Sequence, residues 1–348
     1  MGAALGKPGR SPASAPHDAS PPEVLADYRS YDLRREWEGR ERTTRLEEEL
    51  LSTLATDLDH QRWLELGCGY GRLTPALARR SREYVALDLN SEGLLSVPVP
   101  PGPDRFLRVA ANLHHLPFEQ ESFTVVSLIR VLHHLEDPRT VFREMMRVLV
   151  PGGSLVLSYA PKPTLGSLQQ DILHWIRGVS MGRTYTTFSR KEVDYLGDLP
   201  FPILVPRASY VHRLVEETGG TLTKETGHGP EVLERVLPLR TSQALSRIFG
   251  TTVLASTRFL LCRKPGGTVG APLAEPLHWR CPRCHTPLLP GPAEGGLKCP
   301  GCAFLLRRTT GLIDARYLPP HSRRVGPAPR EARERDGAVP DPSEDPTA

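Results

Sequence analysis

The sequence lacks any apolar run near the 18 or so residues that a membrane-spanning helix needs, and its first 22 residues lack the apolar stretch of a signal peptide. We therefore expect a cytoplasmic chain without a membrane span. Cysteine is scarce, with six in 348 residues, which excludes a disulfide-built scaffold. Hydrophobic residues at 39% and charged residues at 24% exclude a fibrous or wholly disordered chain.

A strong excess of one charge is also missing, because the formal net charge is only +4. The charge is unevenly distributed, however, and residues 278–324 contain eight Lys or Arg against two acids. That segment carries +6 and the remainder about −2, so a polyanion would meet the C-terminal part of the chain.

Composition and pattern divide the chain into segments. Residues 1–22 and 318–348 are rich in Pro with Ala, Ser or charged residues, and we expect both to be disordered tails. Leucines recur at helical spacing within 41–57, which predicts an amphipathic helix. Between 63 and 264, apolar runs alternate with helical stretches.

This alternation predicts an α/β, Rossmann-like, doubly wound sheet of seven mostly parallel strands, with ligands at the carboxyl ends of the strands. The main domain would span 23–264, with a linker at 265–277 where Pro265-Gly266-Gly267 breaks the pattern. The predicted strands are 63–66, 84–87, 106–109, 123–128, 154–159, 221–225 and 257–262.

Residues 63–73 read as a strand, a glycine-rich turn and the start of a helix. Gly67, Gly69 and Gly71 would let the backbone turn sharply and approach a ligand, and the helix start would offer N–H groups to an anion. NAD-binding loops read G-x-G-x-x-G, whereas here the third glycine comes one residue earlier and Glu65 precedes the first. This spacing disfavours a dehydrogenase.

With these features the chain resembles the class I S-adenosylmethionine-dependent methyltransferases, especially the group related to quinone-biosynthesis methyltransferases. The resemblance covers residues 60–160 and continues loosely to 264. It implies S-adenosylmethionine as cofactor, with Glu65 and the three glycines around its methionyl part. Asp88 ends the second predicted strand, 21 residues after Gly67, where a carboxylate accepts both hydroxyls of a ribose.

The segment 111–118 resembles the family segment that usually carries an aspartate for the adenine amino group. Asn112 stands in that place, and its amide oxygen can still accept from an exocyclic amine. The resemblance thus assigns Asn112 and Leu113 to cofactor binding. The run 123–138 resembles the family's fourth strand and loop, with Thr124 replacing a common aspartate.

The loop after the fourth strand contains candidates for acid–base chemistry. Methyl transfer to a hydroxyl or amine requires loss of a proton, which His133 or His134 would accept, unless the pair serves hydrogen bonding or packing. We group Arg130 with the cofactor-binding residues; alternatively, it would meet an acidic substrate or be solvated. Cys68, inside the glycine loop, is assigned to packing and not to nucleophilic catalysis.

Residues 161–212 would form an insert that covers the acceptor. Its aromatic side chains suit a flat or apolar acceptor and equally suit a satellite core. The aromatic residues are Trp175, Tyr185, Phe188, Tyr195, Phe201 and Tyr210.

Two C-x-x-C pairs, Cys281/Cys284 and Cys299/Cys302, are separated by 14 residues rich in Pro and Gly. Two such turns complete a tetrahedral four-thiolate site, for which Zn²⁺ is the expected ion, and four thiolates leave no open position. We therefore predict a small structural zinc ribbon over 278–317. The segment through Gly311-Leu312-Ile313-Asp314 resembles zinc ribbons that are fused to methyltransferases or act as their activator subunits.

Three functions remain open at this stage. The first is methyl transfer to a small metabolite of quinone, lipid or natural-product type. The second is methylation of ribosomal or transfer RNA, with the basic ribbon as the RNA-binding part. The third is a cofactor-binding or interaction protein without catalysis, suggested by Asn112 and Thr124. The acceptor atom and the oligomeric state do not follow from the sequence.

Overall fold

The computed structural model describes residues 24–26, 33–58, 61–162, 191–196, 203–229, 237–252, 255–267, 273, 276–291, 295–320 and 322–325. Its centre is a mixed sheet in the order β11-β12-β13-β14-β4-β3-β2-β5-β6-β10-β9. Seven of these strands occur where the alternation predicts them: β2 (Gln61–Leu66), β3 (Ser81–Asp88), β4 (Arg105–Ala110), β5 (Phe123–Ile129), β6 (Leu149–Tyr159), β9 (Thr221–His228) and β10 (Thr257–Arg263).

Strand pairing gives the predicted doubly wound topology. The strands β4, β3, β2, β5 and β6 are parallel, while β10 pairs antiparallel with both β6 and β9. The strand order reverses between β2 and β5, because β3 and β4 lie to one side of β2 and β5 to the other. Ligands of open α/β sheets bind at such a switch point, at the carboxyl ends of the strands. The α/β fold class is confirmed.

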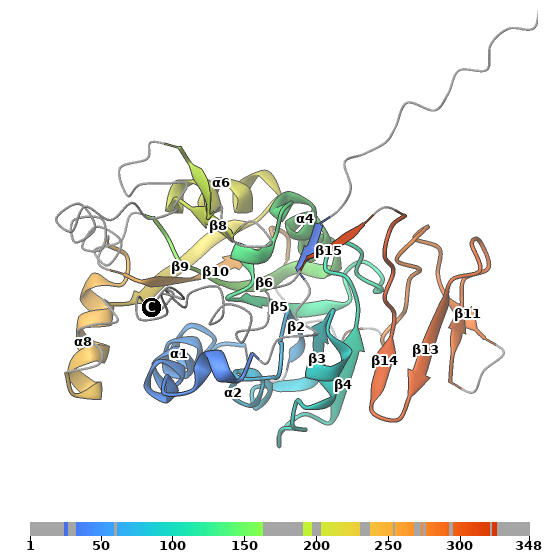
Figure 1. The fold of residues 1–348 in the computed structure, drawn as a ribbon, viewed down its shortest axis with the longest axis horizontal. Coiled ribbons are helices and arrows are strands. Elements are labelled where there is room, and N and C mark those ends of the chain that lie inside the picture. The colour runs from blue at the N-terminus through green and yellow to red at the C-terminus, as the bar shows by residue number, and fades with distance from the viewer. Residues whose placement is uncertain are drawn as a thin grey trace, which may run out of the picture.

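Helices cover both faces of the sheet. In Figure 1, α4 (Pro138–Val148) and α6 (Ala208–Glu217) lie on one side, and α1 (Glu41–Leu54) and α2 (Thr74–Ala78) lie on the other. The core is accordingly split in two, and alternate residues of one strand enter different clusters: Leu64 joins the α4 side and Trp63 the α1 side. Within the described residues, the remaining helices are η1 (Arg35–Trp37), α3 (Ser91–Leu95), η2 (Leu132–His134) and α8 (Leu239–Phe249).

The amphipathic helix predicted over 41–57 is α1, which ends at Leu54. Leu46, Leu51 and Leu54 are buried, as the spacing requires. Glu47 is also fully buried on this helix, a position that the leucine pattern does not predict.

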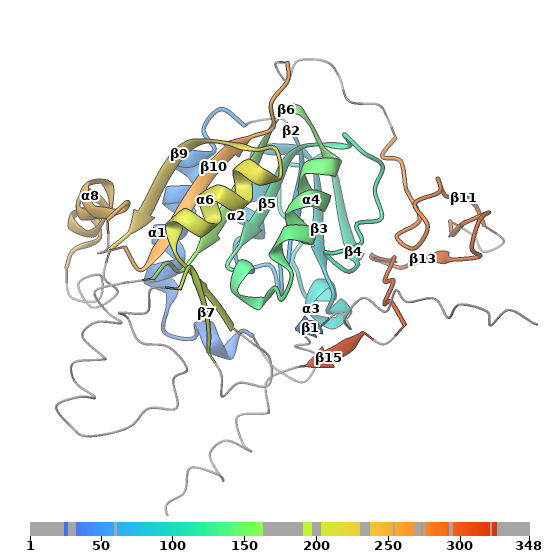
Figure 2. The ribbon, with the colours of Figure 1, turned by 90° about the horizontal axis from the view of Figure 1, so that it is seen from above.

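The cysteine-bearing segment is joined to the main sheet. Its strands are β11 (Leu289–Pro290), β12 (Leu297–Lys298), β13 (Leu305–Thr309) and β14 (Leu312–Asp314), all antiparallel in succession. β14 then pairs parallel with β4, with Ile313 opposite Val109. Figures 1 and 2 show these strands continuing the sheet beyond β4. The segment therefore extends the described sheet from seven strands to eleven.

A second contact joins the two parts at the start of the cysteine segment. Trp279 forms an isolated bridge with Phe118, and their ring centroids are 5.1 Å apart. Trp279 is buried and belongs to the α4-side core cluster. Both ends of the cysteine segment are thus packed on the main domain.

Two short strands involve the segments that flank these domains. β1 (Val24–Ala26) pairs parallel with β15 (Arg323–Val325), which lies within the stretch expected to be a disordered tail. Another hairpin, β7 (Val193–Leu196) with β8 (Ile203–Pro206), belongs to the predicted insert.

Within the described residues, no helix combines the length and apolar character that a membrane crossing requires.

Candidate functional site

The three glycines of the loop after β2 all adopt left-handed backbone conformations, with φ of 68°, 58° and 82° at Gly67, Gly69 and Gly71. A Cβ on Gly67 would lie 2.4 Å from a Val131 methyl, and one on Gly71 would lie 2.5 Å from a Val97 methyl. Glycine is therefore required both for the turn and for the space. Gly67 N also donates to the Leu87 carbonyl at 2.8 Å, which fixes the loop against β3.

Asp88, at the end of β3, lies beside this loop. Its Oδ2 accepts from Gly69 N and its Oδ1 from Asn90 N, each at 2.8 Å. Burial raises the pKa of Asp88, while its backbone hydrogen bonds act in the opposite direction. The carboxylate is thus oriented by two backbone donors, at the carboxyl end of a strand next to the switch point.

Glu65 lies beneath the loop, at the end of β2, and is buried. Its Oε2 accepts from Thr74 Oγ1 at 2.5 Å and from Tyr84 Oη at 2.8 Å. Burial raises the pKa of Glu65, and the two hydroxyl donors oppose that rise. Glu65 therefore ties the end of β2 to α2 and β3. Cys68 is buried as well, and burial raises the pKa of its thiol, which agrees with packing and not with nucleophilic attack.

Asn112 and Leu113 follow β4, at the same carboxyl end of the parallel strands as Asp88. Asn112 is 1% exposed, and its Oδ1 accepts from His114 N at 3.1 Å. Its Nδ2 donates to the main-chain carbonyl of Tyr317 at 3.4 Å. The amide is therefore held from both ends, once by its own turn and once by the residues after β14. Leu113 is half-buried and packs against the α4-side core.

His133 and His134 form the end of η2, directly after β5. Their ring centroids are 3.8 Å apart. Burial and then the charge of Arg130 lower the pKa of His133 to about 4, and burial also lowers the pKa of His134. Both imidazoles are consequently neutral at pH 7, the state in which a histidine accepts a proton.

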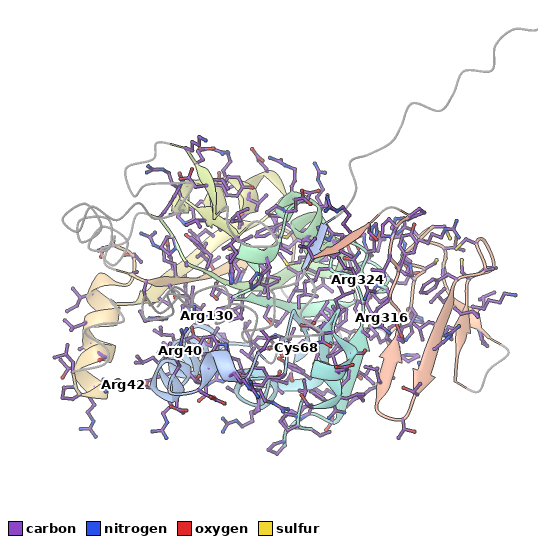
Figure 3. All side chains as sticks on the ribbon, viewed as in Figure 1. Arg40, Arg42, Cys68, Arg130, Arg316 and Arg324 are labelled. Carbon is purple, nitrogen blue, oxygen red and sulfur yellow. The ribbon has the colours of Figure 1, made fainter. Side chains whose placement is uncertain are left out.

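Arg130 directly follows β5 and has a left-handed backbone conformation, with φ of 58°, which is unfavourable for a residue that has a Cβ. Its guanidinium lies 2.5 Å from Glu47 and donates to Thr257 Oγ1 at 3.1 Å. Figure 3 shows Arg130 above α1, and its guanidinium also lies 5.1 Å from the Trp37 ring centroid. The structure thus gives Arg130 a partner inside the protein, whereas the sequence suggested an acidic ligand or solvent.

The Glu47 carboxylate is the centre of a buried charge network that the sequence analysis did not identify. Arg72 lies 2.6 Å from Glu47, and His228 lies 3.7 Å from it. Burial alone would raise the pKa of Glu47, but Arg130, His228 and Arg72 together hold it well below its ordinary value. The one available signal was an acid at position 47 among the buried-face leucines of α1.

The N-terminal segment lies against the glycine loop. Trp37 stacks on Arg72, with 3.5 Å from the guanidinium carbon to the ring centroid, and Arg34 lies over Tyr70 at 5.8 Å. A Cβ on Gly69 would approach a Leu33 methyl to 3.4 Å. Residues 33–37 therefore form one wall beside the loop.

Only part of the predicted acceptor insert lies within the described residues. The β7–β8 hairpin contacts η2 through β8, which brings the insert against the histidine pair. Lys162, just after β6, forms a buried ion pair with Asp194 of β7 and so fastens the hairpin to the sheet. Tyr210 is half-buried on α6. The side chains of Trp175, Tyr185, Phe188, Tyr195 and Phe201 lie outside the described part of the structure.

The four cysteines come together in a single cluster in which all sulfur atoms lie within 4.8 Å of one another. The sulfur of Cys302 lies 3.5 Å from the sulfurs of both Cys281 and Cys284, and the Cys284 and Cys299 sulfurs are 3.3 Å apart. A tetrahedral zinc with bonds of about 2.3 Å separates its sulfurs by roughly 3.8 Å, so this set fits such an ion after a small expansion.

The two C-x-x-C turns are built alike. His285 N donates to the Cys281 carbonyl at 2.9 Å, and Ala303 N donates to the Cys299 carbonyl at 3.2 Å. His285 and Ala303 both have left-handed backbones, with φ of 63° and 59°. This repeated turn brings both cysteines of each pair into the cluster. Cys262 is buried in β10 and is not one of the cluster's residues.

Comparison with known proteins identifies the segment that carries the switch point. Residues 64–157, from β2 to β6, match the family model described as a methyltransferase domain. Over these residues the chain is similar to known methyltransferase domains. The match spans the glycine loop, Asp88, Asn112 and the histidine pair.

Curated relatives match the same region. Demethylmenaquinone methyltransferase of Clavibacter sepedonicus is 38% identical over 99 residues, 28% of this chain and 40% of the relative. Ubiquinone biosynthesis O-methyltransferase of Xanthomonas oryzae is 36% identical over 106 residues, 29% and 44% of the two chains. An uncharacterized methyltransferase of Mycobacterium sp. (strain JLS) is 32% identical over 124 residues, 35% and 48% of the two chains. The chain thus spans less than half the length of these relatives.

Solved structures give weaker likenesses. An S-adenosylmethionine-dependent methyltransferase from Mesorhizobium loti has a TM-score of 0.44 at 19% identity, covering 63% of this chain and 97% of its own. The [4+2]-cyclase SpnF has a TM-score of 0.42 at 16% identity, covering 63% and 82%. At these values neither likeness bears on the reaction.

Proposed function

We propose that this protein transfers a methyl group from S-adenosylmethionine to a small-molecule acceptor of quinone, lipid or natural-product type. The observation that best supports this proposal is the arrangement at the switch point. Three left-handed glycines, the oriented Asp88 carboxylate and the Asn112 turn all lie at the carboxyl ends of the parallel strands. The methyltransferase domain match over 64–157 and the quinone-related names of two relatives support the same reading.

Each site residue would have a distinct part. The glycine loop would surround the methionyl part, Asp88 would accept from the ribose hydroxyls, and Asn112 with Leu113 would contact the adenine. Bound S-adenosylmethionine would supply a methyl group already activated by its sulfonium. His133 or His134, both uncharged at pH 7, would accept the proton of a hydroxyl or amine acceptor.

Arg130 would act indirectly. Because its guanidinium is bound to Glu47 on α1, it would position the β5 loop that carries the histidines, and would not contact the cofactor. The described hairpin of the insert, which contacts η2, would lie over the acceptor and exclude water.

The four-cysteine cluster would hold a structural zinc ion, because its donor set is all sulfur and its spacing fits a tetrahedral ion. Four thiolates leave no position for a substrate. The metal would therefore stabilise the strands that continue the sheet beyond β4.

The direct test is calorimetric titration of metal-quantified protein with S-adenosylmethionine and S-adenosylhomocysteine, beside an Asp88→Ala variant. We expect micromolar binding, about 8 kcal/mol, that the variant loses. A matched control is Asp104→Ala, which removes an exposed carboxylate paired only loosely with Arg82. If the folded, zinc-loaded protein binds neither ligand, the proposal is wrong.

A second candidate is methylation of RNA, favoured by the exposed cations of the cysteine segment. Arg283, Lys298, Arg307 and Arg308 are all exposed there. Protein that binds RNA through them would lose affinity steeply as salt rises, and charge removal at Arg307 and Arg308 would reduce that slope. Salt-independent or undetectable RNA binding, together with turnover on a small acceptor, would exclude this candidate.

A further inference from the structure

The residues that follow β14 run along the carboxyl end of β4. Ala315 N donates to the Ala110 carbonyl at 2.9 Å, which continues the β14–β4 pairing by one step. Ala315 is fully buried. The next two residues, Arg316 and Tyr317, therefore reach the turn that begins with Asn112.

Arg316 and Tyr317 contact both segments assigned to the adenosine side of the cofactor. The Tyr317 carbonyl accepts from Asn112 Nδ2 at 3.4 Å, and the Tyr317 ring packs edge-on against His115 with centroids 5.2 Å apart. Arg316 Nη1 donates to Ser91 Oγ at 3.4 Å, at the start of α3 and three residues after Asp88. Figure 3 shows Arg316 between the β13–β14 strands and β4.

Arg316 is itself held in place by Asp314, the last residue of β14. Its Nη2 lies 2.6 Å from Asp314 Oδ2, and its Nε donates to Asp314 Oδ1 at 2.9 Å. This two-point pairing fixes the plane of the guanidinium. The side chain is about three-quarters buried, with 25% exposure, so the pairing is partly shielded from solvent.

This arrangement gives a chemical reason for an amide, and not a carboxylate, at position 112. An amide offers both an acceptor and a donor, and Asn112 uses Oδ1 toward His114 N and Nδ2 toward the Tyr317 carbonyl. A carboxylate at the same place has acceptors only and would face the Tyr317 carbonyl with like partial charge. Asn112, one of the two residues that depart from the pattern of the resembled family, thus contacts the segment after β14.

We propose that residues 314–317 complete the adenosine side of the cofactor site, holding Asn112 and the start of α3 in the geometry that binds an adenosine-containing ligand. The proposal rests on the proposed function. It makes Arg316 a positioning residue, acting through Ser91, and it makes cofactor affinity depend on the folded state of the cysteine segment.

The test compares two ligands and three variants by calorimetry. S-adenosylhomocysteine probes the whole site and adenosine probes only the adenosine side. The variants are Arg316→Ala, Asn112→Asp and the control Arg308→Ala, which removes an exposed cation of β13 from the same segment. We expect Arg316→Ala and Asn112→Asp to weaken both ligands by similar factors, about threefold to tenfold, and the control to leave both unchanged.

Asn112→Asp gives the sharpest outcome, because the two interpretations predict opposite signs. If the contact with Tyr317 did not matter, a carboxylate would bind the adenine amino group at least as well as the amide. Unchanged or tighter binding by Asn112→Asp, or equal affinities for Arg316→Ala and Arg308→Ala, would overturn the proposal. Failure of the unmodified protein to bind S-adenosylhomocysteine would instead overturn the proposed function.

A measurement on the unmodified chain covers the case in which a variant does not fold. Chelation of the metal, followed by circular dichroism to confirm that the main domain keeps its helices, should weaken adenosine binding, and added zinc should restore it. Full adenosine affinity in metal-free protein whose main domain remains folded would contradict the inference.

Discussion

The Glu47 carboxylate on α1 lies 2.5 Å from the guanidinium of Arg130, the residue after β5, although the two positions are far apart in sequence. Glu47 is fully buried, and Arg72 and His228 share the same carboxylate. One acid on the first long helix therefore orients three basic groups from three other parts of the domain. Removing it would leave buried positive charge without a counterion.

We expect Glu47→Gln to destabilise the protein by about 3 kcal/mol or more, because breaking a buried ion pair leaves its partners uncompensated. Urea unfolding followed by circular dichroism measures this. Glu48→Gln, one position along the same helix, should change the free energy of unfolding by less than about 0.5 kcal/mol. Equal midpoints for the two variants would mean that the network contributes nothing to stability.

The same carboxylate predicts a pH dependence. Its pKa is lower in the folded state than the ordinary value of 4.5, so its contribution is complete above pH 4.5 and is lost as the pH falls below that value. The stability difference between the unmodified protein and Glu47→Gln should therefore be constant near neutrality and narrow in acid. Unfolding curves at pH 7, 5 and 4 test this, and a gap that widens in acid would contradict it.

Gly67→Ala should be far more damaging than an alanine at another left-handed glycine. Gly67 and Gly219 both have positive φ, but only at Gly67 would a Cβ meet a side chain, Val131, at 2.4 Å. Gly219→Ala should lower the free energy of unfolding by about 1 kcal/mol, from backbone strain alone. Gly67→Ala should lower it further, because the new Cβ would also overlap Val131. Adding Val131→Ala to Gly67→Ala should recover part of the loss. Equal melting temperatures for the two single variants would show that the close contact is irrelevant.

Metal content should depend on the clustered cysteines alone. We expect purified protein to contain one zinc per chain, Cys284→Ser to lose it and Cys262→Ser to keep it, as measured by atomic absorption. Chelation should also shift the fluorescence of Trp279, which is buried against Phe118 at the junction. Zinc retained by Cys284→Ser at full stoichiometry would contradict the four-thiolate assignment.

His133 should remain neutral throughout the physiological range. Its pKa is lowered to about 4, so its imidazole is unprotonated above that pH and charged only below it. Histidine NMR signals of the unmodified protein, assigned through a His133→Asn variant, should show no His133 titration between pH 6 and 8. A midpoint near the ordinary 6.5 would mean that the ring is open to solvent and not shielded by its surroundings.

Most strands of the central sheet could be predicted from the sequence because they contain short, mainly apolar runs bounded by turns. The run Phe123–Ile129 is buried throughout, as expected for a parallel strand covered on both faces. Local spacing also predicted the glycine loop and the cysteine cluster, because in each case the residues that meet lie within about twenty positions of one another.

Contacts between distant segments could not be predicted in the same way. Nothing in the sequence of β14 indicates that Ile313 pairs with Val109, because strand pairing depends on the packing of the whole domain. The partners of Arg130 could not be predicted for the same reason. An arginine in a loop is expected to be solvated, and only the structure shows that the buried Glu47 lies beside it. Asn112 was identified by position, but its contact with Tyr317 required the structure.

The pairing of β14 with β4 also changes which strand forms the edge of the sheet on this side. Without the cysteine segment, the carboxyl end of β4 at Val109 and Ala110 would present unpaired backbone N–H and C=O groups, a template on which another chain can add a strand. With it, the outermost strand of the described sheet is β11, only two residues long, and Pro290 has no N–H to donate. The segment therefore also guards the domain against edge-to-edge aggregation.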